Sequence, residues 1–202
     1  MPVNLSKGEK VSLTKGKIGL DALRVGLGWD EQKKSMFSLK SRHQIDCDAS
    51  IFLLDENGVL RDGKNIVYYG ALSHKSGSVM HKGDNLTGEG AGDDETVFIH
   101  LSKVPAGISK ILFIVNIYAC DVRKQHFGMI KNAYIRIIDN ATNEELVRYN
   151  LSDNYEGYTT LIVGEVYKNG SEWDFKALGE ATRDVALQDI RDKLLVGNKL
   201  LT

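Results

Sequence analysis

Short apolar runs rich in Val, Ile, Phe and Tyr, divided by Gly, Asn, Asp and Ser, recur along most of this chain. Runs of this length and composition predict β-strands. The predicted strands are 9–14, 22–29, 45–54, 65–69, 95–101, 109–119, 132–138, 145–151, 160–168 and 172–178. Only the segment 182–195 has helical spacing, because Ala186, Ile190 and Leu194 recur every fourth residue. About ten strands with one late helix predict an all-β fold, a β-sandwich of two mainly antiparallel sheets with a C-terminal helix.

Local patterns add detail to this prediction. The Asn-Gly pairs at 57–58 and 169–170 lie between apolar runs and tolerate the positive φ angles of a tight turn, so each predicts a β-hairpin. The segment 96–101 alternates in hydropathy and is expected to bury one face. The run 111–115 is apolar throughout, which predicts a central strand covered on both faces. Thr182 is the expected N-cap of the helix.

Composition limits the class of protein. The 202 residues are expected to form a single domain, and 26 basic against 27 acidic side chains exclude a global basic field for nucleic acid. Cys47 and Cys120 are far apart and too few for a disulfide framework or a cysteine-based zinc site, which predicts buried thiols in a reducing compartment. No apolar signal core or run long enough to span a membrane is present. We therefore expect a cytoplasmic protein.

The segment 83–95 is the most unusual part of the sequence. It holds five carboxylate side chains and no Lys or Arg, and glycines alternate through its middle. Acids this dense repel one another unless a positive charge lies among them. Glycines such as Gly88 and Gly90 let the backbone bend and turn carbonyl oxygens inward. Carboxylate and carbonyl oxygens are the ligands of Ca²⁺, so the segment predicts a cation site, with a solvated acidic loop as the alternative.

A second acidic element lies on the predicted strand 45–54. Asp46 and Asp48 are two residues apart, so their side chains point to the same face of that strand. Two like charges beside an apolar run are costly unless they are paired or coordinated. The alternative is a solvated strand end. Asp30 is a further acid at the end of a predicted strand, where a turn role is the simpler interpretation.

Other patterns give little support for catalysis. Asp46 and Asp48 are spaced like the paired aspartates of haloacid-dehalogenase-type phosphatases, but that chemistry needs helices between the strands. The glycines of 88–92 do not form a dinucleotide motif, and the acidic segment does not match an EF-hand. The sequence contains no HxxxH pair and no GxSxG elbow. The basic segment 32–44 is most simply a solvated loop, with a partner-binding loop as the alternative.

Taken together and in this order, the motifs resemble the TerD-type tellurium-resistance and general stress protein family. The resemblance runs from about Leu5 to about Gly179. The matching pieces are Leu5–Gly8, Val25–Asp30, Asp46–Ser50, Gly83–Glu95, Arg123–Gly128 and Ala133–Arg136. The resemblance implies a β-sandwich that binds Ca²⁺, with two neighbouring ions, and a link to tellurite and stress resistance.

Carried onto this sequence, the resemblance implies a metal-ligand set made of acids at strand ends and residues of the acidic segment. The expected metal ligands are Asp30, Asp46, Asp48, Asp84, Asn85, Gly88, Gly90, Asp93, Asp94 and Glu95. We expect a non-enzymatic calcium-binding stress-response protein that acts through protein partners, among them other stress-response proteins. The alternative is a metal-dependent phosphoester hydrolase that uses the same carboxylates, and a third interpretation is an interaction scaffold with a structural cation.

Overall fold

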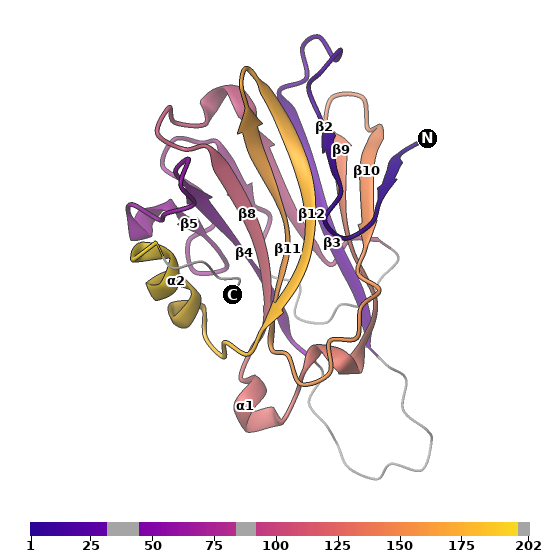
Figure 1. Ribbon diagram of the computed structural model, residues 1–202, viewed down its shortest axis with the longest axis vertical. Helices are drawn as coiled ribbons and strands as arrows, with labels where there is room; N and C mark the ends of the chain where they lie inside the picture. Colours follow the sequence, from indigo (N-terminus) through magenta and orange to yellow (C-terminus); the bar gives the residue numbers. More distant parts are fainter. Residues whose placement is uncertain (32–44, 84–91, 198–202) are drawn as a thin grey trace.

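The computed structural model describes residues 1–31, 45–83 and 92–197, and its strands form two six-stranded sheets packed face to face (Figure 1). The first sheet, sheet A, contains in spatial order β1 (Val3–Leu5), β10 (Glu145–Asn150), β9 (Ile130–Asp139), β3 (Ala22–Glu31), β7 (Glu95–His100) and β6 (Val79–His81). The second, sheet B, contains β2 (Lys10–Ser12), β12 (Glu172–Thr182), β11 (Thr160–Asn169), β8 (Lys110–Ile117), β4 (Cys47–Leu54) and β5 (Ile66–Val67). Within the described residues, the β1–β10 ladder is parallel and the other ladders between named strands are antiparallel. The predicted fold class is confirmed.

Each predicted strand has a counterpart, and the structure adds elements that were not predicted. Strands β1 and β6 have only three residues each, too short for a periodic signal. Helix α1 (Cys120–Arg123) has four residues, with left-handed backbone at Ala119 before it and Lys124 after it. Three single turns of 3₁₀ helix complete the described elements: Gly63–Asn65, Leu101–Lys103 and Phe127–Met129.

The C-terminal helix begins later than predicted. Helix α2 covers Leu187–Leu195, whereas Thr182, the expected N-cap, is the last residue of β12 and pairs with Thr160. Pairing between β11 and β12 extends β12 as far as Thr182, where the sequence predicts the start of the helix. At the true start, the Asp189 carboxylate accepts a hydrogen bond from the backbone N–H of Ala186, 3.1 Å away.

The two Asn-Gly pairs behave differently. Asn169-Gly170 does lie at a β-hairpin, in which Asn169 pairs with Glu172 and Gly170 has a φ of +65°. Asn57-Gly58 forms a turn, with Gly58 at φ +78°, but no two-residue hairpin, because β4 pairs with β5 across a longer connection that includes a 3₁₀ turn. The consecutive strands on either side of Asn57-Gly58 therefore pair antiparallel, as a hairpin requires, but the Asn-Gly turn is one part of a longer connection and not a two-residue loop.

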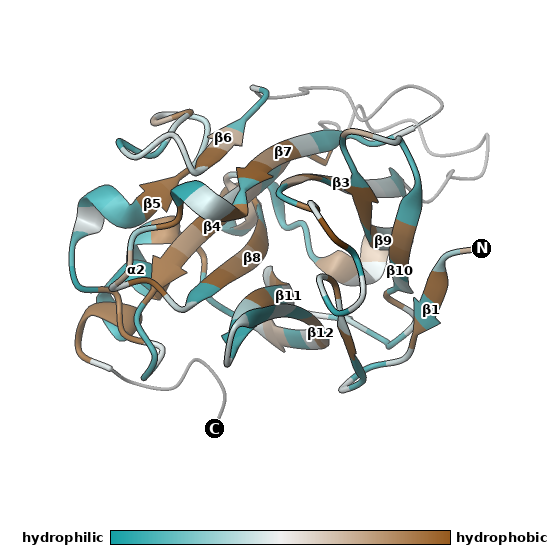
Figure 2. Cartoon of the chain, turned by 90° about the horizontal axis from the view of Figure 1, so that it is seen from above, coloured by the Kyte–Doolittle hydropathy of each residue, from teal (hydrophilic) through white to brown (hydrophobic). Residues whose placement is uncertain are grey.

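Strand β8 is the centre of sheet B, as its uninterrupted apolar run predicts. Phe113 and Val115 belong to the main core between the sheets, and Leu112 and Ile114 belong to a second core on the outer face of sheet B. Ile190 and Leu194 of α2 cover that second core. Figure 2 shows the two layers from above, with α2 beside β4, β5 and β8. Strand β7 alternates in burial, as predicted.

The first strands of the chain connect the two sheets. Strand β1 pairs with β10 in sheet A, and β2 pairs with β12 in sheet B. Between them Gly8, at φ +84°, donates its N–H to Ala177 O at 2.8 Å. The segment 3–12 thus joins both sheets on the same side of the sandwich.

Two further observations complete the fold. Cys47 and Cys120 are buried thiols in the main core, as predicted. No helix in the described ranges has the length and apolar character needed to span a membrane.

Candidate acidic site at one end of the sandwich

The predicted acidic ligands that the structure describes lie at strand ends on one end of the sandwich. Asp30 is near the end of β3, and Asp48 is near the start of β4. Asp46 and Asp94 immediately precede β4 and β7. β3 and β7 are antiparallel, with Leu27 opposite Glu95, so the end of one lies beside the start of the other. The predicted ligands outside the described residues are Asp84, Asn85, Gly88 and Gly90.

Asp94 and Asp30 form the centre of this arrangement. The Asp94 N–H donates to Leu27 O at 2.8 Å, and its carboxylate accepts the Trp29 N–H at 2.7 Å, so the side chain extends the β3–β7 ladder by one bond. Burial raises the pKa of Asp94, and the nearby charges of Asp30 and Asp93 raise it further, against the opposing effect of the Trp29 hydrogen bond. The Asp30 carboxylate accepts a hydrogen bond from Asn132 at 2.8 Å. Two carboxylates therefore lie close enough to repel each other.

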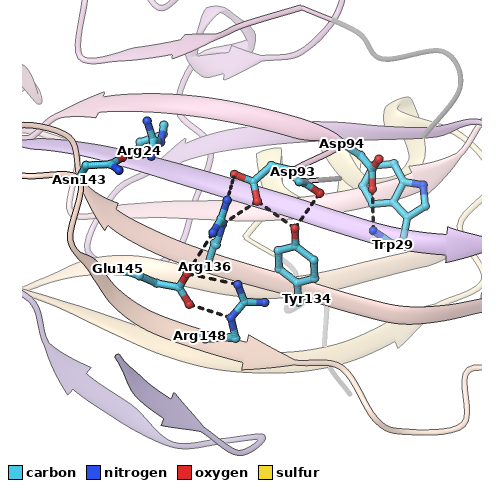
Figure 3. Close-up of polar contacts among 10 residues, drawn as sticks. Arg24, Trp29, Asp93, Asp94, Tyr134, Arg136, Asn143, Glu145 and Arg148 are labelled. Carbon is cyan, nitrogen blue, oxygen red and sulfur yellow. Dashed lines mark hydrogen bonds and ion pairs between the residues drawn. The ribbon is translucent and has the colours of Figure 1, made fainter. Parts of the chain in front are cut away.

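Asp93 points the other way, onto the outer face of sheet A (Figure 3). Its two oxygens accept hydrogen bonds from Arg136 at 2.7 and 3.0 Å, and the Tyr134 hydroxyl lies 3.0 Å from one of them. Burial and the Asp93 charge raise the pKa of Tyr134 to about 12. The hydrogen bonds that Arg136 donates to the Asp93 carboxylate likewise raise the pKa of Arg136.

Strand β10 supplies the rest of this cluster. Arg136 also donates to Glu145 at 3.0 Å, and Arg148 donates to Glu145 at 2.7 and 3.2 Å. The Arg148 guanidinium carbon lies 4.5 Å from the centre of the Tyr134 ring, a cation–π distance. Burial alone would raise the pKa of Glu145, but the hydrogen bonds from Arg148 and Arg136 outweigh it and hold that pKa below its usual range. The contacts close into a cycle, which we call the β9–β10 ring: Asp93, Arg136, Glu145, Arg148 and Tyr134.

Two glycines of β3 make the space that this ring occupies. A Cβ atom at Gly26 would overlap the Asp93 carboxylate, and one at Gly28 would lie 2.5 Å from the Tyr134 ring. Val25, Leu27 and Trp29 are buried on the core side of β3, so the outward positions between them are Gly26 and Gly28. The Asp93 carboxylate and the Tyr134 ring therefore lie directly against the backbone of β3, at a site that we call the seat of the ring.

Glu95 points into the protein. It is 1% exposed, and its carboxylate lies 3.2 Å from Nε2 of the equally buried His81. His81 Nδ1 accepts the Gly83 N–H at 3.1 Å, which leaves the ring proton on Nε2, facing Glu95. Burial lowers the pKa of His81. Asp93, Asp94 and Glu95 are consecutive, and the bend at Asp94 before β7 directs their side chains to three different surroundings.

Asp46 and Asp48 lie on sheet B. Arg123 of α1 forms an ion pair with Asp46 at 3.7 Å. Asp48 is 7% exposed and pairs in register with Asn116 of β8. Asn116 is also 7% exposed, and its side-chain oxygen is buried without a hydrogen-bond partner among the described residues. The side-chain oxygen of Asn116 thus belongs to the residue that pairs with the buried Asp48.

A shallow depression of about 700 Å³ opens beside Asp30 and Asp94, and Trp29, Tyr134 and Arg148 also line it. Across the ranges 1–31, 45–83 and 92–197, no three His, Cys, Asp or Glu side chains converge as a metal-binding group. The metal-ligand assignments remain predictions, because part of the predicted set lies outside those ranges.

The sequence pattern of the TerD domain matches residues 1–193. This chain belongs to the TerD family. Among TerD relatives, stress response protein SCP2 of Bacillus subtilis is 53% identical over 195 residues, covering 94% of this chain and 98% of the relative. Tellurium resistance protein TerD of Serratia marcescens is 40% identical over 180 residues, covering 89% and 91%. A crystal structure of a telluride resistance protein homologue from Streptomyces coelicolor superposes with a TM-score of 0.61 at 22% identity, covering 84% of this chain and 95% of that one, which supports the TerD fold.

Several residues of this end of the sandwich were not predicted as functional. The alternating glycines in the run 25–29 signal an outer face that must stay empty of side chains. Asn116 stands out as the one polar side chain in the apolar run 111–117. Arg136 and Tyr134 are two residues apart on β9 and so share a face, but nothing local indicates Asp93 as their partner.

Proposed function

We propose that this protein is a non-enzymatic, Ca²⁺-binding stress-response protein of the tellurium-resistance type, which acts in the cytoplasm through protein partners. The observation that carries the proposal is the pair Asp30 and Asp94. Their charges repel, and within the described residues no Lys or Arg forms an ion pair with either carboxylate. A cation between such groups relieves the repulsion.

The chemistry of the donors fits Ca²⁺. Asp30 and Asp94 offer carboxylate oxygens, and on sheet B Asp48 offers another beside the orphaned amide oxygen of Asn116. Ca²⁺ prefers oxygen ligands of these kinds and accepts irregular geometry, whereas Mg²⁺ demands a compact octahedron. When bound, the ion would supply positive charge that neutralises the acids. These candidate oxygen donors lie on two different sheets, in keeping with the expectation of two ions.

The other parts of the proposal rest on sequence and family. The chain has no GxSxG elbow and no HxxxH pair, which favours binding over catalysis. Relatives are named for stress response and tellurium resistance, and neither name describes a reaction. Two buried thiols in a chain without a disulfide suit a reducing compartment. A protein without a reaction of its own exerts its effect through partners.

The test is Ca²⁺ titration by calorimetry after chelator treatment, together with thermal melts in chelator, Mg²⁺ and Ca²⁺. At about 100 times its dissociation constant, Ca²⁺ adds about 2.7 kcal/mol of stability per site, and Mg²⁺ adds less. Asp94→Asn and Asp30→Asn shrink the Ca²⁺-induced shift, whereas the matched control Asp192→Asn, on exposed α2 surface, leaves it unchanged.

Two outcomes contradict the proposal. If the wild-type melting midpoint is the same in chelator and in millimolar Ca²⁺, the proposed cation site is refuted. Metal-dependent hydrolysis of p-nitrophenyl phosphate that Asp94→Asn abolishes and Asp192→Asn retains favours the phosphoester hydrolase over the binding protein.

A further inference from the structure

We infer that Asp93 is a positioning residue and not a metal ligand: the β9–β10 ring holds Asp93 on the outer face of sheet A and thereby fixes the carboxylate of the next residue, Asp94, beside Asp30. This inference rests on the proposed cation site and revises the ligand set expected from the sequence.

The first argument is that the Asp93 oxygens are already engaged. Arg136 donates one hydrogen bond to each oxygen, at 2.7 and 3.0 Å, and the Tyr134 hydroxyl lies 3.0 Å from one of them. The Asp93 side chain is 9% exposed. A bidentate guanidinium–carboxylate pair is among the strongest side-chain contacts, and a guanidinium at this distance repels a cation that approaches the same oxygens.

The second argument is direction. Asp93 and Asp94 are adjacent, and the chain bends at Asp94 just before β7, so a fixed Asp93 side chain fixes the backbone from which the Asp94 side chain departs. Asp94 meets β3 through two bonds, from its own N–H to Leu27 O at 2.8 Å and from the Trp29 N–H to its carboxylate at 2.7 Å. The same backbone position therefore places Asp93 on the outer face and the Asp94 carboxylate at the strand end.

The third argument is that the anchor is itself held in place. Glu145 accepts hydrogen bonds from both Arg136 and Arg148, and Arg148 lies over the Tyr134 ring, so both groups that grip Asp93 are oriented from β10 (Figure 3). Gly26 leaves the space in which the Asp93 carboxylate lies. This arrangement serves an anchor, since it closes off the oxygens that a ligand must present.

The two roles predict opposite effects of Arg136→Gln on Ca²⁺ affinity. If Asp93 were a ligand, the substitution would free its oxygens, remove a nearby positive charge and tighten binding. If Asp93 is an anchor, the substitution releases the backbone at 92–94 and weakens binding about 10- to 100-fold, the loss typical of residues that orient a metal ligand. Arg136→Gln removes no carboxylate or carbonyl, so every candidate metal ligand remains.

The experiment is calorimetric Ca²⁺ titration of the full chain as wild type, Arg136→Gln, Asp93→Asn and the double variant, each first shown to be folded by its thermal melt. We expect both single variants to weaken Ca²⁺ binding. The double variant should bind no more weakly than the weaker of the two single variants, because both substitutions break the same contact between Arg136 and Asp93. The matched control is Arg24→Gln, which removes an arginine from the same sheet face that bonds to Asn143 outside the ring; its affinity stays within about twofold of wild type.

The other possible outcomes refute either this inference alone or the inference together with the proposed function. Tighter or unchanged binding by Arg136→Gln, together with loss of binding by Asp93→Asn, makes Asp93 a ligand and refutes the inference while the proposed function stands. Equal weakening by Arg24→Gln shows an effect of charge on the whole face and also refutes it. A wild-type protein that takes up no Ca²⁺ removes the proposed function and the inference together.

Discussion

Replacing Gly26 with alanine tests the seat of the β9–β10 ring with the smallest possible change. One added methyl group would overlap the Asp93 carboxylate and force it away from Arg136. The backbone itself accepts alanine, because Gly26 lies in a regular strand and is not among the glycines with positive φ. Any loss of stability therefore reports the contact between the methyl group and the carboxylate.

The magnitude follows from two opposing effects. Hydrogen bonds to charged groups contribute about 1.5–3 kcal/mol each, and displacement of Asp93 leaves Arg136 partly solvated, so we take about 3 kcal/mol as the loss for the pair. Alanine is better than glycine in a strand by about 0.5–1 kcal/mol. The net expectation is a loss of about 2 kcal/mol in the free energy of unfolding. For a chain of this size that is about 4–8 °C in melting temperature.

Urea unfolding followed by tryptophan fluorescence, with calorimetric melts, measures this difference. The matched control is Gly107→Ala, since Gly107 has no atom within 4 Å of its hypothetical Cβ and no positive φ, and we expect a change within about 0.5 kcal/mol. In an Asp93→Ala background the Gly26→Ala change should cost nothing. A Gly26→Ala protein as stable as wild type, or one whose loss persists in the Asp93→Ala background, refutes the reasoning.

Three further predictions concern charge, packing and thiols. The folded pKa of Glu145 is lowered, so its ion pairs stabilise the protein above the unfolded pKa of about 4.3 and the benefit is lost as the pH falls through the folded value. Glu145→Gln should thus lower the free energy of unfolding by about 2 kcal/mol at pH 7 and by little in acid, and a pH-independent difference contradicts this. Leu194→Ala, in the core beneath α2, should cost about 2–5 kcal/mol in urea unfolding, whereas Leu195→Ala, on its exposed side, should cost little; equal losses contradict the placement of α2. Cys47 and Cys120 should both alkylate in urea without reductant and resist alkylation when native, and mass spectrometry that finds a bridge refutes the prediction.

The fold was predictable because strand periodicity is a local property. The unbroken apolar run 111–115 identified the central strand, and the helical spacing of Ile190 and Leu194 identified α2. The start of α2 was predicted too early because pairing between Thr160 and Thr182, which a local pattern does not contain, extends β12. Strands β1 and β6 are defined by the strands with which they pair, β10 and β7, and not by their own residues.

The candidate site was predictable in composition and not in arrangement. The acids were found because dense charge is visible in a sequence, but their division between Asp94 at the strand end, Asp93 in the ring and Glu95 in the core depends on the bend before β7 and on Arg136 and His81. Asp93 and Arg136 are 43 positions apart. Such a pair forms only when β3, β7 and β9 are assembled in register.

Strands β1 and β2 impose an order on folding during synthesis. Residues 3–12 leave the ribosome long before their partners, because the partners of β1 lie at 147–149 and those of β2 at 174–176. At about 5–20 residues per second, these first strands wait about 10–30 s before their partners exist. During that interval β1 and β2 have no strand to pair with, so their addition to the edges of β10 and β12 is a late step in the assembly of the sandwich. A nascent chain stalled before residue 147 would therefore leave β1 and β2 unpaired and open to protease, and release of the finished chain would protect them.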